Sequence, residues 1–252
     1  MPFDIDWVRS RLADHRIDWH STTGSTMTEA QLLAVAGCAS GTVVGAEEQT
    51  AGQGRYGRQW HSESNAGLYV SMVLRYPFAP NALPLVTLAL GLATGEAILK
   101  ATDLACDLRW PNDVLVQSKK CAGILTQLEG SAIIAGIGIN VNHSAFPASL
   151  SAIATSLRIA SGRAHSRERL LVQLVASVDS FCTLLEKEGK EPILDMFARA
   201  SSFVHGRRVS VEQGDSLIEG TTMGLNESGF LLLRDDRGKQ NVIIAGGVRP
   251  CS

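Results

Sequence analysis

The chain of 252 residues lacks the cysteine pattern of a disulfide framework or of a structural zinc site. Its five cysteines, Cys38, Cys106, Cys121, Cys182 and Cys251, are odd in number and widely separated, and no two of them form a CxxC pair. The chain also lacks an excess of positive charge, because 23 lysines and arginines stand against 25 aspartates and glutamates. These absences predict a reduced, cytoplasmic protein and argue against nucleic acid as its main partner.

Neither a secretion signal nor a membrane span is indicated. The first seven residues are acidic and have no positive region ahead of an apolar one, so they do not fit a signal peptide. The longest apolar stretch, residues 82–99, contains Pro84 and Glu96 and is short for a span of about 20 apolar residues. We expect a buried helix there and no membrane partner.

The patterns that are present are typical of an α+β fold. A capping box formed by Thr26 and Glu29 predicts a helix that Gly37 ends. Long apolar stripes predict helices over residues 84–101 and 166–187, and a shorter helix is expected near residues 152–157. Apolar runs predict the strands of a central sheet at residues 17–21, 42–47, 68–74, 104–109, 114–116, 121–128 and 132–141.

The pattern changes after Gly206 to short strands separated by turns. Strands are predicted at residues 209–212, 218–225, 230–234 and 241–245. Such a series is typical of a small β-barrel like an SH3 domain. The sequence therefore predicts two domains, a larger α+β domain over residues 1–204 and an SH3-like domain over residues 205–252.

Two polar clusters interrupt the apolar pattern. The first, Gln49-Thr-Ala-Gly-Gln-Gly-Arg-Tyr-Gly-Arg-Gln-Trp60, alternates glycines with arginines. Backbone N–H groups of such a loop can hold phosphate or carboxylate oxygens, and arginine adds a planar fork suited to them. The second cluster, Arg109-Trp-Pro-Asn-Asp113, is followed by Lys119-Lys-Cys-Ala-Gly123. A surface loop would explain one cluster alone, whereas two in one chain favour a binding site.

Several candidate residues also have an ordinary structural explanation. Ser25 and Thr26, with the amide of Gln49, suit a small ligand that has adjacent N–H and C=O groups. Taken alone, the two hydroxyls are more typical of plain helix capping. Lys120 offers a movable positive charge, yet adjacent lysines are usually solvated. Asp113 can assist Mg²⁺ or accept a proton, or can merely serve a turn.

The clusters resemble those of biotin–protein ligases in their order and spacing. The resemblance covers nearly the whole chain and implies an SH2-like α+β catalytic domain that binds biotin and ATP, followed by an SH3-like domain. The segments that carry it are Ser25-Thr26, Gln49–Trp60, Leu68-Tyr-Val-Ser-Met72, Arg109–Asp113, Lys120-Cys-Ala-Gly-Ile124, Gly136-Ile-Gly-Ile-Asn-Val-Asn142 and Ala245-Gly-Gly-Val-Arg249.

The resemblance implies a two-step reaction. The carboxylate of biotin attacks the α-phosphate of ATP, with Mg²⁺ required, and gives biotinyl-5′-AMP and pyrophosphate. A lysine amine on the biotin carboxyl carrier protein of acetyl-CoA carboxylase, or of a similar carboxylase, then displaces AMP. Such a site must stabilise phosphorane charge and keep the labile anhydride from water. Direct ligation of a metal by the protein is not expected, because Mg²⁺ comes with ATP.

The resemblance also implies site residues. Lys120, Asp113 and Arg55 are the expected catalytic residues. Gln53 stands where the family usually has arginine, and Met27 stands where asparagine is common. The expected biotin contacts are Ser25, Thr26, Met27, Gln49, Gln53, Gly54, Arg55, Trp60 and Lys120, and the expected nucleotide contacts are Gly52, Arg58, Asn112 and Asn140.

Two other functions fit part of the pattern. Lipoate–protein ligase shares the fold class and the adenylate chemistry, but the set Ser25, Thr26 and Gln49 favours a ureido ring over an apolar dithiolane. A nucleic-acid-binding module would use the barrel and the basic loop, but the net charge of −2 argues against it.

A regulatory form of the family carries an N-terminal winged helix. Because only about 20 residues precede the Ser25 motif, too few for three helices, we expect the form with a single function and no specific nucleic acid partner.

Overall fold

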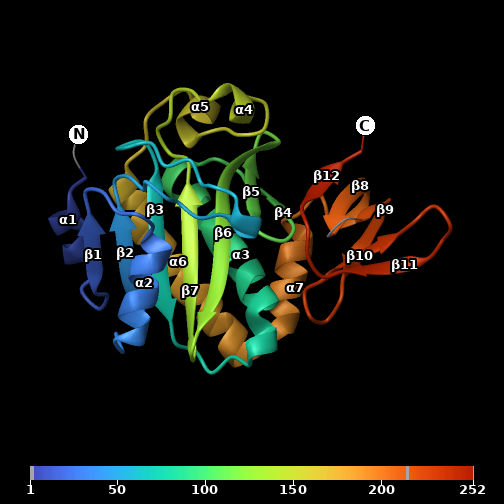
Figure 1. Cartoon of the computed structure of the whole chain (residues 1–252), viewed down its shortest axis with the longest axis horizontal. Coiled ribbons are helices and arrows are strands. Elements are labelled where there is room, and N and C mark those ends of the chain that lie inside the picture. The colour runs from blue at the N-terminus through green and yellow to red at the C-terminus, as the bar shows by residue number, and fades with distance from the viewer. Residues whose placement is uncertain (1–2, 214–215, 252) are drawn as a thin grey trace.

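The larger part of the molecule is a mixed seven-stranded sheet with helices on both faces (Figure 1). The computed structural model describes residues 3–213 and 216–251. The strands are β1 (Ile17–His20), β2 (Thr42–Ala46), β3 (Leu68–Leu74), β4 (Asp107–Arg109), β5 (Asp113–Val116), β6 (Lys119–Glu129) and β7 (Ala132–Ile139). They lie in the order β1-β2-β3-β7-β6-β5-β4, and only β1 and β2 pair in parallel among the described strands of this sheet. The predicted α+β class is confirmed.

The helices divide between the two faces of this sheet. The helix α2 (Thr26–Val35) packs on β2, β3 and β7, whereas α3 (Leu83–Thr102) and α6 (Arg167–Glu188) cover the other face, with α7 (Lys190–Arg199) beside α3. Two short helices lie above the end of the sheet in Figure 1. The remaining elements are α1 (Ile5–Arg11), the short helices α4 (Ala148–Ser151) and α5 (Leu157–Ser161), and the 3₁₀ turns η1 (Arg55–Gly57) and η2 (Pro80–Ala82).

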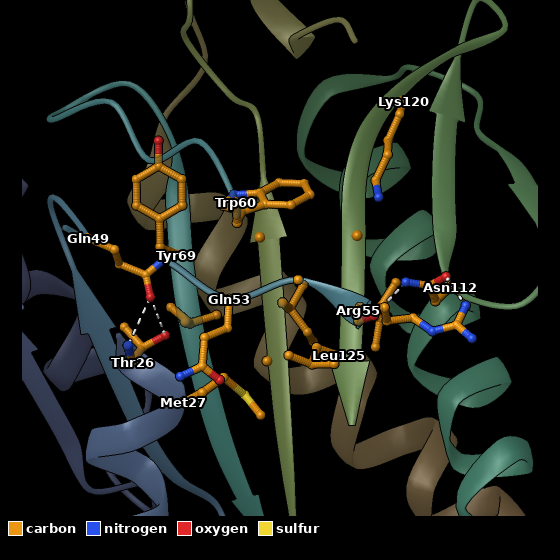
Figure 2. Close-up of a pocket in the computed structure, with 17 residues that line it drawn as sticks. Thr26, Met27, Gln49, Gln53, Arg55, Trp60, Tyr69, Asn112, Lys120 and Leu125 are labelled. Atoms are coloured by element: carbon orange, nitrogen blue, oxygen red, sulfur yellow. Dashed lines mark hydrogen bonds between the residues drawn. The ribbon is translucent and has the colours of Figure 1, made fainter. Parts of the chain in front are cut away.

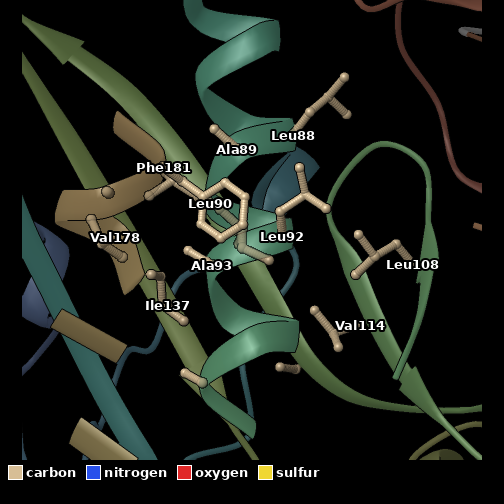
Figure 3. Packing of buried hydrophobic residues seen from close by; sticks show 14 of the residues in the cluster. Leu88, Ala89, Leu90, Leu92, Ala93, Leu108, Val114, Ile137, Val178 and Phe181 are labelled. Carbon is tan, nitrogen blue, oxygen red and sulfur yellow. The ribbon is translucent and has the colours of Figure 1, made fainter. Parts of the chain in front are cut away.

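The main core lies between the sheet and α3. Figure 3 shows leucines of α3 packed with Val178 and Phe181 of α6 and with Leu108 and Val114 of the sheet. The segment of residues 80–102 is the one described helix long and apolar enough to cross a membrane, but 72% of its most apolar window is buried. It is therefore the buried core helix that the sequence predicts.

The C-terminal part forms a separate antiparallel sheet. Its strands lie in the order β11-β10-β9-β8-β12. The indole Nε1 of Trp110 donates to the backbone oxygen of Gly229 at 2.9 Å, which joins this sheet to the larger domain. The strands are β8 (His205–Gln213), β9 (Ser216–Leu225), β10 (Leu231–Arg234), β11 (Gln240–Ile243) and β12 (Val248–Pro250), of which β12 has no counterpart among the predicted strands.

The predicted capping box is wrong. The N-cap of α2 is Ser25, whose Oγ accepts from the N–H of Met27 at 3.3 Å. Glu29 instead accepts from the hydroxyl of Thr23 at 2.9 Å. Thr26 is the first residue inside the helix and not its cap, and its hydroxyl donates to the side chain of Gln49.

Two other predicted elements differ from the structure. The expected helix at residues 152–157 is replaced by two short helices, α4, which ends at Ser151, and α5, which begins at Leu157. The expected strand at residues 104–109 is confined to β4, because Asp103 turns the chain with a φ of 65° and residues 104–106 form the connection.

Candidate active site

The site lies on the α2 face of the sheet, where the strand positions Gly123, Gly136 and Gly138 have no side chain. Tyr69, Gly138, Gly123 and Asp113 are successive partners across β3, β7, β6 and β5. A Cβ atom at Gly138 would lie 2.5 Å from the indole of Trp60, and one at Gly123 would lie 2.9 Å from it. The glycines therefore leave the space in which the indole lies flat against the sheet.

An inner pocket is enclosed by this face, by α2 and by the loop of residues 49–60 (Figure 2). Its volume is about 50 Å³. Pockets for small molecules usually hold roughly 300 Å³ or more, so the inner pocket is narrow with the loop in this position. The pocket is lined by Thr26, Met27, Gln49, Gln53, Gly54, Arg55, Trp60, Tyr69, Val70, Asn112, Lys120, Gly123, Ile124, Leu125, Gly136, Ile137 and Gly138.

One end of the inner pocket has a fixed set of polar groups. The Oε1 atom of Gln49 accepts from the backbone N–H of Thr26 at 2.8 Å and from its hydroxyl at 3.1 Å. The Nε2 atom of Gln49 donates to Ser62 Oγ at 3.0 Å, and Ser71 donates to the hydroxyl of Thr26 at 2.9 Å. These bonds orient the amide of Gln49 before any ligand binds.

A charged group marks the other end. Lys120 Nζ lies 2.5 Å from Asp113 Oδ1 and 5.2 Å from the centroid of the Trp60 ring. Arg109 Nη2 lies 2.7 Å from Asp113 Oδ2. Burial alone would raise the pKa of Asp113, but Lys120 and Arg109 outweigh burial, and the pKa lies below its usual value. Asp113 is therefore a carboxylate that holds the ammonium group of Lys120 in place.

The glycine–arginine loop is fastened to both domains. Arg55 Nη1 donates to Asn112 Oδ1 at 3.0 Å and to the backbone oxygen of Gly246 at 3.3 Å. Arg55 Nη2 and the N–H of Gly246 both donate to the hydroxyl of Tyr56, at 2.8 and 2.7 Å. Burial lowers the pKa of Arg55, which nevertheless stays charged in proteins. The bonds made by Arg55 and Tyr56 are called the loop latch below.

A wider outer pocket of about 530 Å³ adjoins the inner one. It lies between the loop, α4 and the C-terminal domain. Its residues are Gly54, Arg55, Tyr56, Arg58, Gln59, Trp60, His61, Arg109, Asn112, Asp113, Lys120, Asn140, Phe146, Leu150, Ile153, Ala154, Glu212, Ala245, Gly246 and Gly247.

Most of the predicted site residues line one of these pockets. Ser25 and Gly52 line neither. Ser25 is the N-cap of α2, and a Cβ atom at Gly52 would lie 2.8 Å from the backbone oxygen of Trp60, so Gly52 lets two parts of the loop approach closely. The inner pocket includes Thr26, Met27, Gln49, Gln53, Gly54, Arg55, Trp60 and Lys120, and the outer pocket adds Arg58, Asp113 and Asn140, while Asn112 lines both.

Other lining residues were not predicted from the sequence. Gly136 and Gly138 have a signal, since two glycines separated by one residue in a strand lie on the same face. Tyr69 stands within a motif that the resemblance uses. Phe146 and Ile153 come from a segment of irregular pattern, and no local signal places them at the site.

A sheet face covered by a glycine–arginine loop adjoins two pockets, and Lys120 lines both of them. The sequence profile of the Biotin/lipoate A/B protein ligase family matches residues 19–144, and that of the Biotin protein ligase C terminal domain matches residues 204–248. The chain belongs to this family.

Within the family, the similarity extends over both domains to biotin ligases. The Biotin--[acetyl-CoA-carboxylase] ligase of Mycobacterium tuberculosis is 31% identical over 98% of this chain and 94% of its own. The Bifunctional ligase/repressor BirA of Bacillus subtilis is 30% identical over 94% of this chain and 75% of its own. The structure of the biotin protein ligase from Aquifex aeolicus in complex with biotin and ATP has a TM-score of 0.83 and 29% identity, covering 94% of this chain and 99% of that one.

Proposed function

We propose that this protein is an ATP-dependent biotin–protein ligase, which forms biotinyl-5′-AMP and transfers the biotinyl group to one lysine of a biotin carboxyl carrier protein. One observation carries the proposal. Lys120 lines both pockets, so a carboxylate in the inner pocket and a phosphate in the outer pocket would meet at its ammonium group. The two substrates of adenylation need that arrangement.

The inner pocket suits biotin in its polarity. Thr26 and Gln49 form a polar end suited to the N–H and C=O groups of a ureido ring. Met27 and Leu125 provide an apolar wall for the rest of the molecule. The Nε1 atom of Trp60 is buried and has no acceptor within residues 3–213 and 216–251, so it is a donor that a ligand can use. This polar set favours biotin over lipoate.

The outer pocket would hold ATP. Arg58, Asn112 and Asn140 are the proposed nucleotide contacts. The carboxylates that line this pocket are already paired, Asp113 with Lys120 and Arg109, and Glu212 with Arg249 at 3.2 Å. The residues present therefore fit a Mg²⁺ ion that is held by phosphate oxygens and water. When it is bound, this ion would neutralise phosphate charge.

The chemistry follows from these positions. The ammonium of Lys120 would stabilise the negative charge that grows on the α-phosphate as the biotin carboxylate attacks. In the second step the lysine nitrogen of the carrier forms a bond to the acyl carbon, the bond to AMP breaks, and the amine loses a proton. Asp113 is proposed to assist this incoming amine. The loop latch would meanwhile keep water from the anhydride.

The acceptor is proposed to be the biotin carboxyl carrier protein of a carboxylase, on the basis of the relatives named above. A cytoplasmic location is supported by the five free cysteines.

The proposal is tested by incubating the protein with biotin, Mg-ATP and a purified carrier domain and then measuring the intact mass of the carrier. We expect one added biotinyl group, mapped by peptide sequencing to a single lysine. Lipoate in place of biotin, and a carrier whose acceptor lysine is replaced by arginine, should give no addition. Modification with lipoate but not with biotin would overturn the proposal.

A separate prediction concerns the strand glycines that leave space for the indole of Trp60. Gly138→Val adds atoms where the indole of Trp60 lies, so we expect Trp60 to shift and the dissociation constant for biotin to rise at least about tenfold, equivalent to about 1.4 kcal/mol. Isothermal titration with biotin measures this. Gly95→Ala is the matched control, because a Cβ atom there meets its nearest neighbour at an ordinary 3.6 Å. Unchanged biotin affinity in Gly138→Val would show that the indole is not a wall of the site.

A further inference from the structure

Three metal-ligating side chains converge beside the outer pocket. One nitrogen each from His61 and His143 and one carboxylate oxygen of Glu63 lie within 4.8 Å of one another. His61 lines the outer pocket, Glu63 is exposed, and His143 is fully buried just after β7. The adenylation chemistry proposed above uses none of the three, and they are called the histidine cluster below.

The hydrogen bonds around His143 leave it with an unused lone pair. The hydroxyl of Tyr69 donates to the backbone oxygen of Glu63 at 3.0 Å and lies 3.1 Å from Nε2 of His143. Because a hydroxyl has one proton, both bonds form only if Nε2 carries a hydrogen and donates to Tyr69. The proton is then absent from Nδ1, which is buried and has no partner within the described part of the chain. A buried imidazole nitrogen that accepts no hydrogen bond destabilises the folded protein unless a ligand binds to it.

This arrangement is the one that a metal-binding histidine needs. A ligating imidazole commonly donates its other N–H to an oxygen that is itself fixed, which sets the tautomer and the direction of the ring. Tyr69 does this here. The ring of Phe146 stacks on His143 with centroids 5.1 Å apart, which further restrains its orientation.

We propose that His61, Glu63 and His143 form a site for a divalent transition metal of the zinc class, with Nδ1 of His143 as its buried ligand. Two imidazoles and a carboxylate suit Zn²⁺, with water in a fourth position, whereas Mg²⁺ prefers oxygen ligands. Ligand atoms on tetrahedral zinc lie about 3.4 Å apart. The three ligand atoms must therefore move slightly closer together, and the exposed side chain of Glu63 has room to move toward the two histidines.

The bound metal would join two segments that form the wall of the active site. His61 follows Trp60 directly, and His143 follows β7. These segments already touch, since the N–H of Asn142 donates to the backbone oxygen of Ala66 at 2.6 Å. A metal bond between them would restrain the backbone next to the indole. This is a structural role, separate from the Mg²⁺ that accompanies ATP, and it does not depend on which acid the enzyme activates.

The test is calorimetric titration of the chelator-treated full chain, prepared without a histidine tag, with Zn²⁺ and separately with Mg²⁺. We expect one Zn²⁺ per chain, a rise in the midpoint of thermal unfolding with Zn²⁺, and no Mg²⁺ binding at the cluster. His61→Ala and Glu63→Gln, both changes at side chains that are not fully buried, should each weaken Zn²⁺ binding at least tenfold. His205→Ala, at an exposed histidine in the other domain, should leave it unchanged.

A second readout is the visible absorption of the Co²⁺-loaded protein, which is much stronger for four-coordinate Co²⁺ than for the six-coordinate aquated ion and should be lost in His61→Ala. The proposal fails if the parent protein binds no Zn²⁺. It fails equally if His61→Ala and Glu63→Gln bind as tightly as the parent, because the metal would then lie elsewhere. Neither result decides the proposed ligase function, which is tested separately with the carrier domain.

Discussion

Lys120→Ala is expected to slow adenylate formation about a hundredfold while the protein remains folded. The ammonium group lies where carboxylate and phosphate would meet, and loss of one transition-state charge contact costs about 3 kcal/mol. Stability should change little, because Asp113 keeps its ion pair with Arg109 when Lys120 is removed. The measurement is pyrophosphate release in a single turnover at saturating biotin and Mg-ATP, beside thermal unfolding of each variant.

The neighbouring lysine is the matched control for this experiment. Lys119 is exposed and lines neither pocket, and its Nζ donates to the backbone oxygen of Ser151 at 3.0 Å. Lys119→Ala removes the same charge from the chain and should retain the parent rate. A folded Lys120→Ala protein with a nearly normal rate would exclude the catalytic role that we give to this residue.

Arg55→Gly is expected to release the adenylate before transfer and so to label proteins that the parent enzyme ignores. Arg55 bonds the loop to Asn112 and to Gly246 of the other domain. Removing these contacts should act mainly on the off-rate of the intermediate. Escaped biotinyl-AMP is an activated acyl donor and reacts with any amine nearby. Incubation with biotin, Mg-ATP and serum albumin, followed by blotting for biotin, measures the labelling.

Two further variants separate the latch from simple loosening of the backbone. Arg55→Ala removes the same hydrogen bonds without adding the freedom of glycine, and should show most of the labelling. Tyr56→Phe removes the hydroxyl that accepts from both Arg55 and Gly246 and should show a part of it. If all three variants form adenylate yet leave albumin unlabelled, Arg55 does not retain the intermediate.

The sequence predicted the fold well where the pattern is local. The strand at residues 68–74 is predicted to the residue, and the ends of β2, α3 and α6 agree within a residue. The helix α7 was not predicted; it begins directly after Gly189 and has Pro192 in its first turn. Proline is tolerated in the first turn of a helix, and buried Ile193 and Phe197, four residues apart, provide the apolar face.

The sequence predicted the site only in part, because the rest depends on how distant segments pair. The predicted motifs contain the loop and Lys120, which line the pockets. The alignment of Tyr69, Gly138, Gly123 and Asp113 across four strands depends on strand register. Register cannot be read from any one segment of the sequence. The bonds from the loop to Gly246 and the approach of His61 to His143 join segments far apart in the chain, and for the same reason neither was predicted.

The most direct test of the central claim is exchange of labelled pyrophosphate into ATP, with no carrier protein present. This exchange isolates the first step, in which an acid and ATP meet at Lys120. We predict exchange that requires both biotin and Mg²⁺, that lipoate does not support, and that nucleic acid neither replaces nor stimulates. Exchange supported by lipoate alone, or no exchange with any acid tested, would contradict the account.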